Sequence, residues 1–205
     1  MTSSRSDLRR QMRARRRLVT VDERKIAARR FAIAADRSHL LRPSLRIAVY
    51  QPYGHEADIA PLTRRAWDRG CIVHAPVITD RNRFIMRFVP YEPNARLQTN
   101  SFGIPEPANT SREWISPLHL DLIFMPLVAF DSRGWRLGSG AGFYDRSLSY
   151  LRFERRWRRP KLIGVAYEHQ LIDELVPGEW DVPMDAVITE ARIHRFQSHH
   201  SGSTR

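Results

Sequence analysis

The chain has 205 residues, of which 42% are hydrophobic and 27% are charged, a composition typical of a globular protein with one substantial core. No apolar run approaches the ~20 residues that a membrane-spanning helix needs, and the first residues lack the apolar segment of a signal peptide. We therefore predict a cytoplasmic protein with no membrane partner. The single cysteine, Cys71, excludes an internal disulfide and lies in an apolar run that predicts a buried strand position.

The net charge of +12 first suggests a nucleic-acid partner. The charge is local, however, because residues 1–42 hold 13 Lys and Arg against 4 Asp and Glu, a surplus of 9 that leaves +3 for the other 163 residues. Two helices with solvated arginine faces would explain this surplus, and so would a site for a phosphate-bearing ligand. No base-reading motif accompanies the charge, so we expect no specific nucleic-acid partner.

The order of apolar patterns along the chain predicts an α/β fold. Two N-terminal helices are expected, and the capping-box pair Thr20 and Glu23 places the start of the second near Val21. Alternation of strands and helices predicts an open, largely parallel sheet with helices on both faces, which makes three layers. The expected strands are residues 45–50, 71–77, 84–89, 121–125, 162–167 and 186–189, with helices at residues 58–69 and 143–157.

Two segments fall outside this regular pattern. Residues 90–117 contain five prolines and predict a long irregular connection, of the kind that often forms a binding loop or lid. Residues 197–205 are expected to form a flexible C-terminal tail. We therefore predict one domain over residues 1–196, and the oligomeric state stays open.

The densest chemical signal lies in residues 121–146. Gly138, Gly140 and Gly142 alternate just before a helix that is expected to begin near Phe143. Glycines at alternate positions let the backbone approach a ligand closely and turn several N–H groups toward one point. These donors and the positive end of the following helix would suit a phosphate group.

The residues that flank this loop favour the phosphate interpretation over a purely structural turn. The guanidinium of Arg136 can neutralise phosphate oxygens, and the carboxylate of Asp145 can hold the cation that accompanies a triphosphate. The loop is not a Walker loop, and it meets the dinucleotide fingerprint only in part, because Phe143 stands where a third small residue is needed.

The same segment resembles the signature of a known family. Residues 126–131, followed by Arg136-Leu137-Gly138 and by Gly142-Phe143-Tyr144-Asp145-Arg146, look like the pattern of 5-formyltetrahydrofolate cyclo-ligase, also called methenyltetrahydrofolate synthetase. Further matches follow in order along the chain: Arg15-Arg16-Arg17, Glu56-Ala57-Asp58, Phe102-Gly103-Ile104-Pro105-Glu106-Pro107, Gly164-Val165-Ala166-Tyr167, Asp181-Val182-Pro183 and residues 185–190.

The resemblance implies a fold and a reaction. The fold is expected to be similar to the NagB/RpiA/CoA-transferase-like sheets. The reaction is the closure of 5-formyltetrahydrofolate to 5,10-methenyltetrahydrofolate, with ATP as co-substrate, Mg²⁺ as cofactor and release of ADP and phosphate through a phosphorylated formyl intermediate. Such phosphoryl transfer asks the protein for positioning and charge neutralisation rather than for a covalent nucleophile.

The resemblance also assigns residues to roles. Magnesium is expected at Asp145 and Asp181. The folate is expected at Tyr53, Glu56, Asp58 and Phe102, where a carboxylate accepts from amino-pyrimidine donors and an aromatic ring stacks on the pterin. ATP is expected at Arg5, Arg9, Arg136, Leu137, Gly138, Ser139, Gly140, Ala141, Gly142, Phe143 and Tyr144, with Arg136 and Tyr144 also catalytic.

Four positions depart from the common pattern of the family. Arg5 stands where Lys is common, Ile59 where Thr is frequent, Leu127 where Gly is frequent, and Ala141 where Gly or Lys is frequent. The changes at Ile59 and Ala141 keep open the alternative of a 5-formylfolate-binding protein without catalysis. A basic nucleic-acid-binding protein is the second alternative, supported only by the N-terminal charge.

Overall fold

The computed structural model describes residues 4–80, 85–108, 114–152 and 160–196, and its centre is a seven-stranded sheet with strand order β12-β11-β9-β6-β1-β2-β3. All neighbours are parallel except the edge pairs β2–β3 and β11–β12. The prediction of an open, largely parallel α/β sheet is therefore confirmed. The strands are β1 (Arg46–Ala48), β2 (Ile72–Asp80), β3 (Ile85–Pro90), β6 (Leu122–Pro126), β9 (Lys161–Val165), β11 (Ala186–Ile188) and β12 (Ile193–Arg195).

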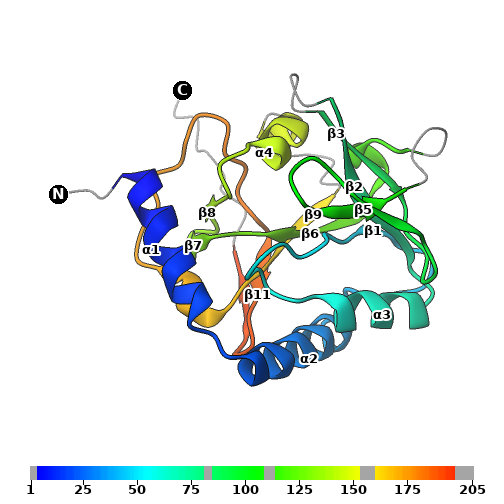
Figure 1. Cartoon of the computed structure of the whole chain (residues 1–205), viewed down its shortest axis with the longest axis horizontal. Helices are drawn as coiled ribbons and strands as arrows, with labels where there is room; N and C mark the ends of the chain where they lie inside the picture. Colours follow the sequence, from blue (N-terminus) through cyan, green and yellow to red (C-terminus); the bar gives the residue numbers. More distant parts are fainter. Residues whose placement is uncertain (1–3, 81–84, 109–113, 153–159, 197–205) are drawn as a thin grey trace, which may run out of the picture.

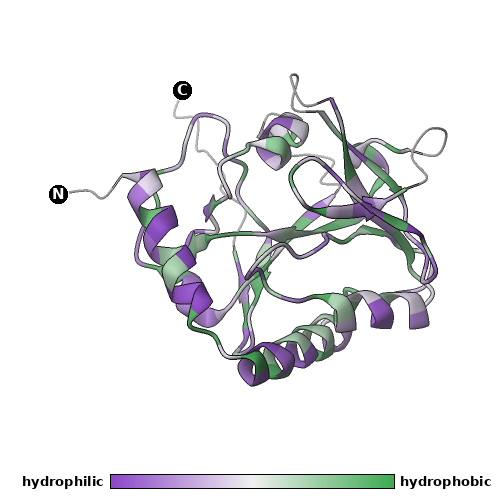
Figure 2. Ribbon diagram, in the orientation of Figure 1, coloured by the Kyte–Doolittle hydropathy of each residue, from purple (hydrophilic) through white to green (hydrophobic). Residues whose placement is uncertain are grey.

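Helices cover both faces of this sheet (Figure 1). On one face lie α2 (Val21–Arg37) and α3 (Ala60–Asp68), and on the other lie α4 (Phe143–Ser147) and the 3-10 turn η2 (Ser149–Arg152). Figure 2 shows polar and apolar residues alternating along α2, as expected for a helix with one buried side. Thr20 and Glu23 form the capping box from which α2 starts.

Two apolar clusters fix these layers. Phe31, Leu62 and Phe124 belong to the cluster between the sheet and the helices α2 and α3. Phe88 and Leu148 belong to the cluster on the α4 side. Because each of these five side chains is no more than 1% exposed, both faces of the sheet are closed to water along its centre.

The order of the strands defines a switch point between β1 and β6. From β1 the chain runs outward to β2 and β3, and it later returns to the other side of β1 as β6 before continuing to β9 and β11. In open α/β sheets the loops that leave two such strands diverge and open a crevice at their carboxyl ends. The topology therefore places a ligand site after Ala48 and Pro126.

A small second sheet carries the glycine-rich loop. It pairs β10 (Leu171–Ile172), β7 (Ala129–Asp131) and β8 (Arg136–Leu137) in the order β10-β7-β8. The helix α1 (Arg5–Arg17) packs beside it through Leu8 and Met12. This sheet holds the start of the loop at Gly138 next to α1.

The proline-rich connection is more regular than the sequence suggested. Within it, β4 (Leu97–Thr99) and β5 (Pro105–Pro107) form an antiparallel hairpin, so the prediction of an irregular segment over residues 90–117 was wrong there. The side chain of Asn100 closes the turn by accepting from the N–H groups of Phe102 and Ile104 at 2.8 and 3.1 Å. Such side-chain bonds are local and leave no periodic apolar signal.

The predicted helix over residues 143–157 was also wrong in its length. The helix α4 ends at Ser147, and η2 follows after Leu148. The hydroxyl of Ser149 donates to the main-chain oxygen of Arg146 at 3.0 Å, and such bonds compete with helical hydrogen bonding. Residues 153–159 and the predicted tail over residues 197–205 lie outside the described residues.

The remaining short elements are the 3-10 turns η1 (Pro117–His119) and η3 (Glu168–Gln170). Cys71 is buried directly before β2, close to its predicted strand position. Among the described residues, no helix combines the length and the apolar character required to cross a bilayer.

We predict that the Asp131→Asn variant loses about 3 kcal/mol of the free energy of unfolding. The carboxylate of Asp131 is fully buried and accepts from the N–H groups of Arg133, Trp135 and Leu175 and from the guanidinium of Arg133. An amide would leave some of these donors unpaired. Urea denaturation measures the loss, and the exposed Asp22→Asn variant is the control; equal stability of the two variants would contradict this role.

Candidate functional site

A cavity of about 500 Å³ lies at the switch point of the sheet. Tyr50, Gln51 and Glu56 reach it from the segment that follows β1, and Leu127 and Val128 reach it from the segment that follows β6. Further lining residues come from α1, from β2 and β3, from the β4–β5 hairpin, and from the segment that runs from β8 through the glycine-rich loop into α4. The site therefore brings together segments that are far apart in the sequence.

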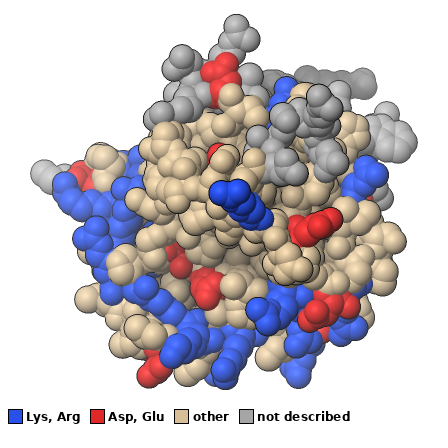
Figure 3. All heavy atoms as spheres, turned by 45° about the vertical axis from the view of Figure 1, so that its right-hand side comes forward, with Lys and Arg blue, Asp and Glu red and all other residues tan. Residues whose placement is uncertain are grey.

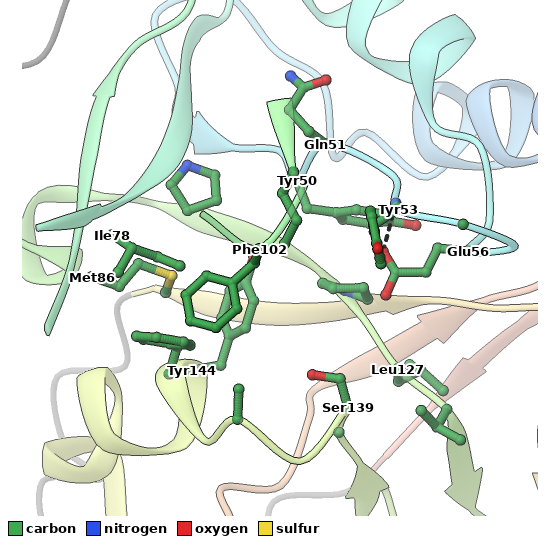
Figure 4. A pocket seen from close by; sticks show the side chains of 18 of the residues that line it. Tyr50, Gln51, Tyr53, Glu56, Ile78, Met86, Phe102, Leu127, Ser139 and Tyr144 are labelled. Atoms are coloured by element: carbon green, nitrogen blue, oxygen red, sulfur yellow. Dashed lines mark hydrogen bonds between the residues drawn. The ribbon is translucent and has the colours of Figure 1, made fainter. Parts of the chain in front are cut away.

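One wall of the cavity is apolar and rich in aromatic rings (Figure 4). The ring of Phe102, at the tip of the hairpin, meets the ring of Phe143 edge-on at a centroid distance of 5.7 Å. A Cβ built on Gly103 would lie 3.3 Å from the ring of Tyr53, so the hairpin tip also lies against Tyr53. Ile78 and Met86 complete this wall, which suits a flat ring system.

A second part of the lining is charged and comes largely from α1. Arg13, Arg16 and Arg17 line the cavity together with His55 and Glu56. Figure 3 shows Lys and Arg side chains gathered along the left and lower edges of the face that it presents. Burial lowers the pKa of the His55 imidazole, and the positive charges of Arg24, Arg17 and Arg16 lower it further.

Glu56 is the one carboxylate on this charged wall. Its Oε2 accepts from the main-chain N–H of Tyr53 at 3.1 Å. Burial raises the pKa of Glu56 above its ordinary value, while that hydrogen bond and the charges of Arg16 and Arg13 oppose the shift. The position suits a group that accepts hydrogen bonds from ligand N–H donors.

The glycine-rich loop presents unpaired amides. The main-chain N–H groups of Ser139, Gly140, Ala141 and Gly142 donate to none of the residues that the structure describes. Gly140 and Gly142 have φ angles of +111° and +73°, in a region of backbone conformation that residues other than glycine rarely adopt. The loop is therefore open to an anion, and the five-residue helix α4 behind it adds only a small dipole.

Two arginines of α1 hold the carbonyl side of this loop. Nε of Arg9 donates to the main-chain oxygen of Gly138 at 2.9 Å, and Nη2 of Arg13 donates to that of Ser139 at 2.7 Å. With their carbonyl oxygens engaged, the peptide groups are fixed against rotation. The arginines thus both position the loop and bring positive charge to it.

Arg136 and Asp145 form an ion pair within the site. Nη2 of Arg136 lies 2.5 Å from Oδ1 of Asp145, and Nη1 donates to the main-chain oxygen of Val182 at 2.8 Å. Arg136 is only 3% exposed, so its charge is held in place by the fold. The two residues singled out beside the glycines therefore act on each other.

Asp181 is partnered in a similar way from α1. Its Oδ2 lies 2.7 Å from Nη1 of Arg5 and accepts from the N–H of Gly178 at 2.8 Å. Oδ1 of Asp181 and Oδ2 of Asp145 accept no hydrogen bond from any described residue. The described residues contain no group of three or more metal-ligating side chains, so a cation here would need ligand oxygens in addition to these two carboxylates.

Burial determines the protonation of the Tyr144 phenol. Its pKa lies well above the ordinary value because of burial, and the charge of Glu56 raises it further. The hydroxyl therefore stays protonated and can donate a hydrogen bond in the cavity. Tyr144 and Glu56 both line the cavity, on different sides of it in Figure 4.

The structure brings most of the expected site residues to one cavity, but not all. Leu137 is fully buried in β8, and Gly140 packs toward Arg9. Asp58 accepts from the N–H of Ala60 at the start of α3. The expected residues that line the cavity are Tyr53, Glu56, Phe102, Arg136, Gly138, Ser139, Ala141, Gly142, Phe143, Tyr144 and Asp145, whereas Arg5, Arg9, Asp58, Leu137, Gly140 and Asp181 are not among its lining residues.

Several lining residues escaped sequence reasoning. Met86 and Ile78 come from strands, where an apolar side chain carries no sign of a site. Glu106 is a buried carboxylate between two prolines of β5, and it accepts from Asn100 at 3.1 Å. The four-four-three spacing of Arg5, Arg9, Arg13 and Arg16 puts them on one face of α1 and could have been recognised as a signal.

A cavity at the switch point of an α/β sheet, with unpaired loop amides beside it, is typical of enzymes that bind a phosphate-bearing ligand. The sequence pattern of the 5-formyltetrahydrofolate cyclo-ligase family matches residues 1–190, and the chain belongs to that family.

Named relatives agree with this placement. The chain is 36% identical over 149 residues to the 5-formyltetrahydrofolate cyclo-ligase of Escherichia coli (strain K12). The aligned residues cover 72% of this chain and 79% of that one. It is 24% identical over 194 residues to the cyclo-ligase of Mus musculus, covering 93% and 95%. The solved structure of the 5,10-methenyltetrahydrofolate synthetase of Aquifex aeolicus superposes with a TM-score of 0.77 at 27% identity, covering 97% of this chain and 98% of that one.

The raised pKa of Glu56 makes a prediction about stability. The folded state takes up the Glu56 proton more readily than the unfolded state, so this group favours folding at acid pH. That contribution is lost as the pH rises from the ordinary glutamate pKa through the raised folded value. Urea denaturation of the wild type and Glu56→Gln over a pH series should show their difference changing only in that window, and parallel curves would contradict the burial of this carboxyl.

Proposed function

We propose that this chain catalyses the ATP-dependent cyclisation of 5-formyltetrahydrofolate to 5,10-methenyltetrahydrofolate. The proposal rests on membership of the family and on one observation, the adjacency of the aromatic and acidic cavity to the four unpaired amides of residues 139–142. A flat folate ring and a phosphate chain can therefore meet in one enclosed space.

The chemistry to be performed is the activation of a formyl oxygen. The oxygen attacks the γ-phosphorus of ATP, the bond from that phosphorus to the bridging oxygen breaks, and ADP leaves. N10 of the folate then attacks the formyl carbon, the carbon–oxygen bond breaks, phosphate leaves and N10 gives up its proton. Positioning and charge neutralisation are the tasks left to the protein.

The residues of the chain suit these two tasks. The amides of residues 139–142 would bind phosphate oxygens, with Arg9 and Arg13 fixing the loop from behind. Glu56 would accept from the pterin N–H groups, and the rings of Tyr53 and Phe102 would cover the ring faces. The protonated phenol of Tyr144 would donate between the two ligands.

The donor set at the loop also fits a magnesium ion accompanying ATP. Asp145 and Asp181 each keep one oxygen without a described partner, and hard cations of this kind take oxygen from carboxylates, phosphate and water. The ion would supply charge neutralisation to the phosphates. Arg136 holds Asp145 in place through their ion pair.

The alternatives from the sequence receive less support. The arginines of α1 at positions 5, 9, 13 and 16 contact the protein itself, which leaves fewer of them for a polyanion. A 5-formylfolate-binding protein without catalysis would have the same cavity, so a measurement of turnover distinguishes it from an enzyme. The single domain over residues 1–196, the cytoplasmic location and the NagB/RpiA/CoA-transferase-like class stay predictions.

The test of the proposed function is the appearance of methenyltetrahydrofolate from 5-formyltetrahydrofolate, followed by its absorbance with and without ATP. We expect product only with ATP and magnesium, together with an equal amount of ADP. Folate binding without product under either condition would instead establish the binding-protein alternative.

We predict that Asp145→Asn lowers kcat by about 100-fold or more, because an amide keeps a hydrogen bond to Arg136 but removes the negative charge. The Tm should fall, because the buried charge of Arg136 loses its anionic partner, so kcat is compared at a temperature at which both proteins are folded. The control is Asp68→Asn, at the exposed end of α3. Wild-type kcat in Asp145→Asn would contradict the assigned role.

A further inference from the structure

Arg16 is a buried cation on the wall of the cavity that forms no ion pair with the residues described. It is 8% exposed. Its Nη1 donates to the main-chain oxygen of Leu127 at 3.3 Å, whereas Nε and Nη2 make no hydrogen bond with any residue in the described part of the chain. Burying a guanidinium with a single long hydrogen bond and no ion pair is costly, so a purely structural explanation is incomplete.

The contact of Arg16 with Leu127 contributes little to holding that segment. The same oxygen of Leu127 accepts from Nε2 of Gln170 at the shorter distance of 2.9 Å, and Nε2 of Gln170 also reaches the oxygen of Val128 at 3.0 Å. Gln170 is itself buried. The segment after β6 therefore stays fixed without Arg16.

Glu56 is the acidic neighbour of Arg16, and both line the same cavity. Each side chain lies in the field of the other, yet the two form no ion pair. Figure 4 shows Glu56 and Leu127 on the same side of the cavity, and Arg16 contacts Leu127. One wall thus offers a hydrogen-bond acceptor and, close to it, a cation with unused donors.

We propose that Arg16 is a substrate-binding residue that donates to the carbonyl oxygen on the pyrimidine ring of the folate, next to the N–H groups that Glu56 accepts. The inference rests on the proposed function. The pyrimidine edge of a reduced pterin carries an amino group, a ring N–H and a carbonyl oxygen in sequence, so its donors and its acceptor match Glu56 and Arg16.

This arrangement has a consequence for selectivity. An analogue with an amino group in place of the ring carbonyl would set N–H donors against the donors of Arg16. A buried site that hydrogen-bonds one group discriminates strongly against a ligand that leaves it unpaired. Arg16 would therefore make the site selective for 4-oxo over 4-amino rings.

The experiment compares Arg16→Met with wild type by calorimetric titration of 5-formyltetrahydrofolate, its 4-amino analogue and ATP. We expect the wild type to prefer the 4-oxo ligand by about 10-fold or more, and Arg16→Met to weaken that ligand by about 30-fold with little change for the other two. Its Tm without ligand should be equal or higher. The affinity of Arg16→Lys for the 4-oxo ligand should lie between those of the wild type and Arg16→Met. Arg15→Met, a change at the exposed neighbour, should bind all three ligands like the wild type.

Three outcomes would overturn the inference. The first is a wild type that does not prefer the 4-oxo ligand, and the second is an Arg16→Met variant that keeps the wild-type preference. The third is an Arg16→Met variant with a lower Tm and equally weakened binding of all three ligands, which would mark a structural role. Turnover of the wild type separates this failure from that of the proposed function. If wild type forms methenyltetrahydrofolate, only the role of Arg16 fails; if it does not, the proposed function fails and this inference with it.

Discussion

The site depends on the way α1 is fastened to the rest of the molecule by arginine side chains. Arg5 pairs with Asp181, and Arg9, Arg13 and Arg16 each donate to a main-chain oxygen of the segments that surround the cavity. These contacts run along the whole helix. Because main-chain oxygens carry only partial charge, the arginines keep most of their positive charge while they position the loop.

This fastening links the two halves of the cavity. Arg9 and Arg13 lie against the glycine-rich loop, while Arg16 lies beside Glu56 on the wall assigned to the folate. One helix therefore contacts both the glycine-rich loop and the wall that holds Arg16. A reaction that joins a phosphate to a formyl group needs a fixed distance between the two, since orientation is a large part of its catalysis.

The sequence predicted the parts of the molecule that are local or periodic. The capping box at Thr20, the strands of the large sheet other than β12 and the start of α4 at Phe143 all follow from short patterns. The antiparallel edge strand β12 and the β4–β5 hairpin were not predicted, because no local sequence pattern identifies the strands with which they pair. The turn at Asn100 depends on side-chain hydrogen bonds rather than on apolar spacing.

The site shows the same division. Glu56, Phe102, Gly138 and Gly142 carry recognisable chemistry, and all four line the cavity. Ion pairing was not predictable, and it changes the roles of the charged residues.

Arg136 could be named from its place beside the glycines. Its hydrogen bonds to Asp145 and Val182 form only once β8, α4 and the segment before β11 meet in the fold. A buried arginine held at both Nη atoms cannot swing to follow a phosphate, so its effect on one is through its fixed charge and through the carboxylate that it orients. Further positive charge beside the glycine-rich loop comes from Arg9 and Arg13 of α1, which donate to its main-chain oxygens. Arg5, Arg9, Arg13 and Arg16 are 4 of the 13 Lys and Arg of residues 1–42, so their contacts around the cavity account for part of the N-terminal basicity.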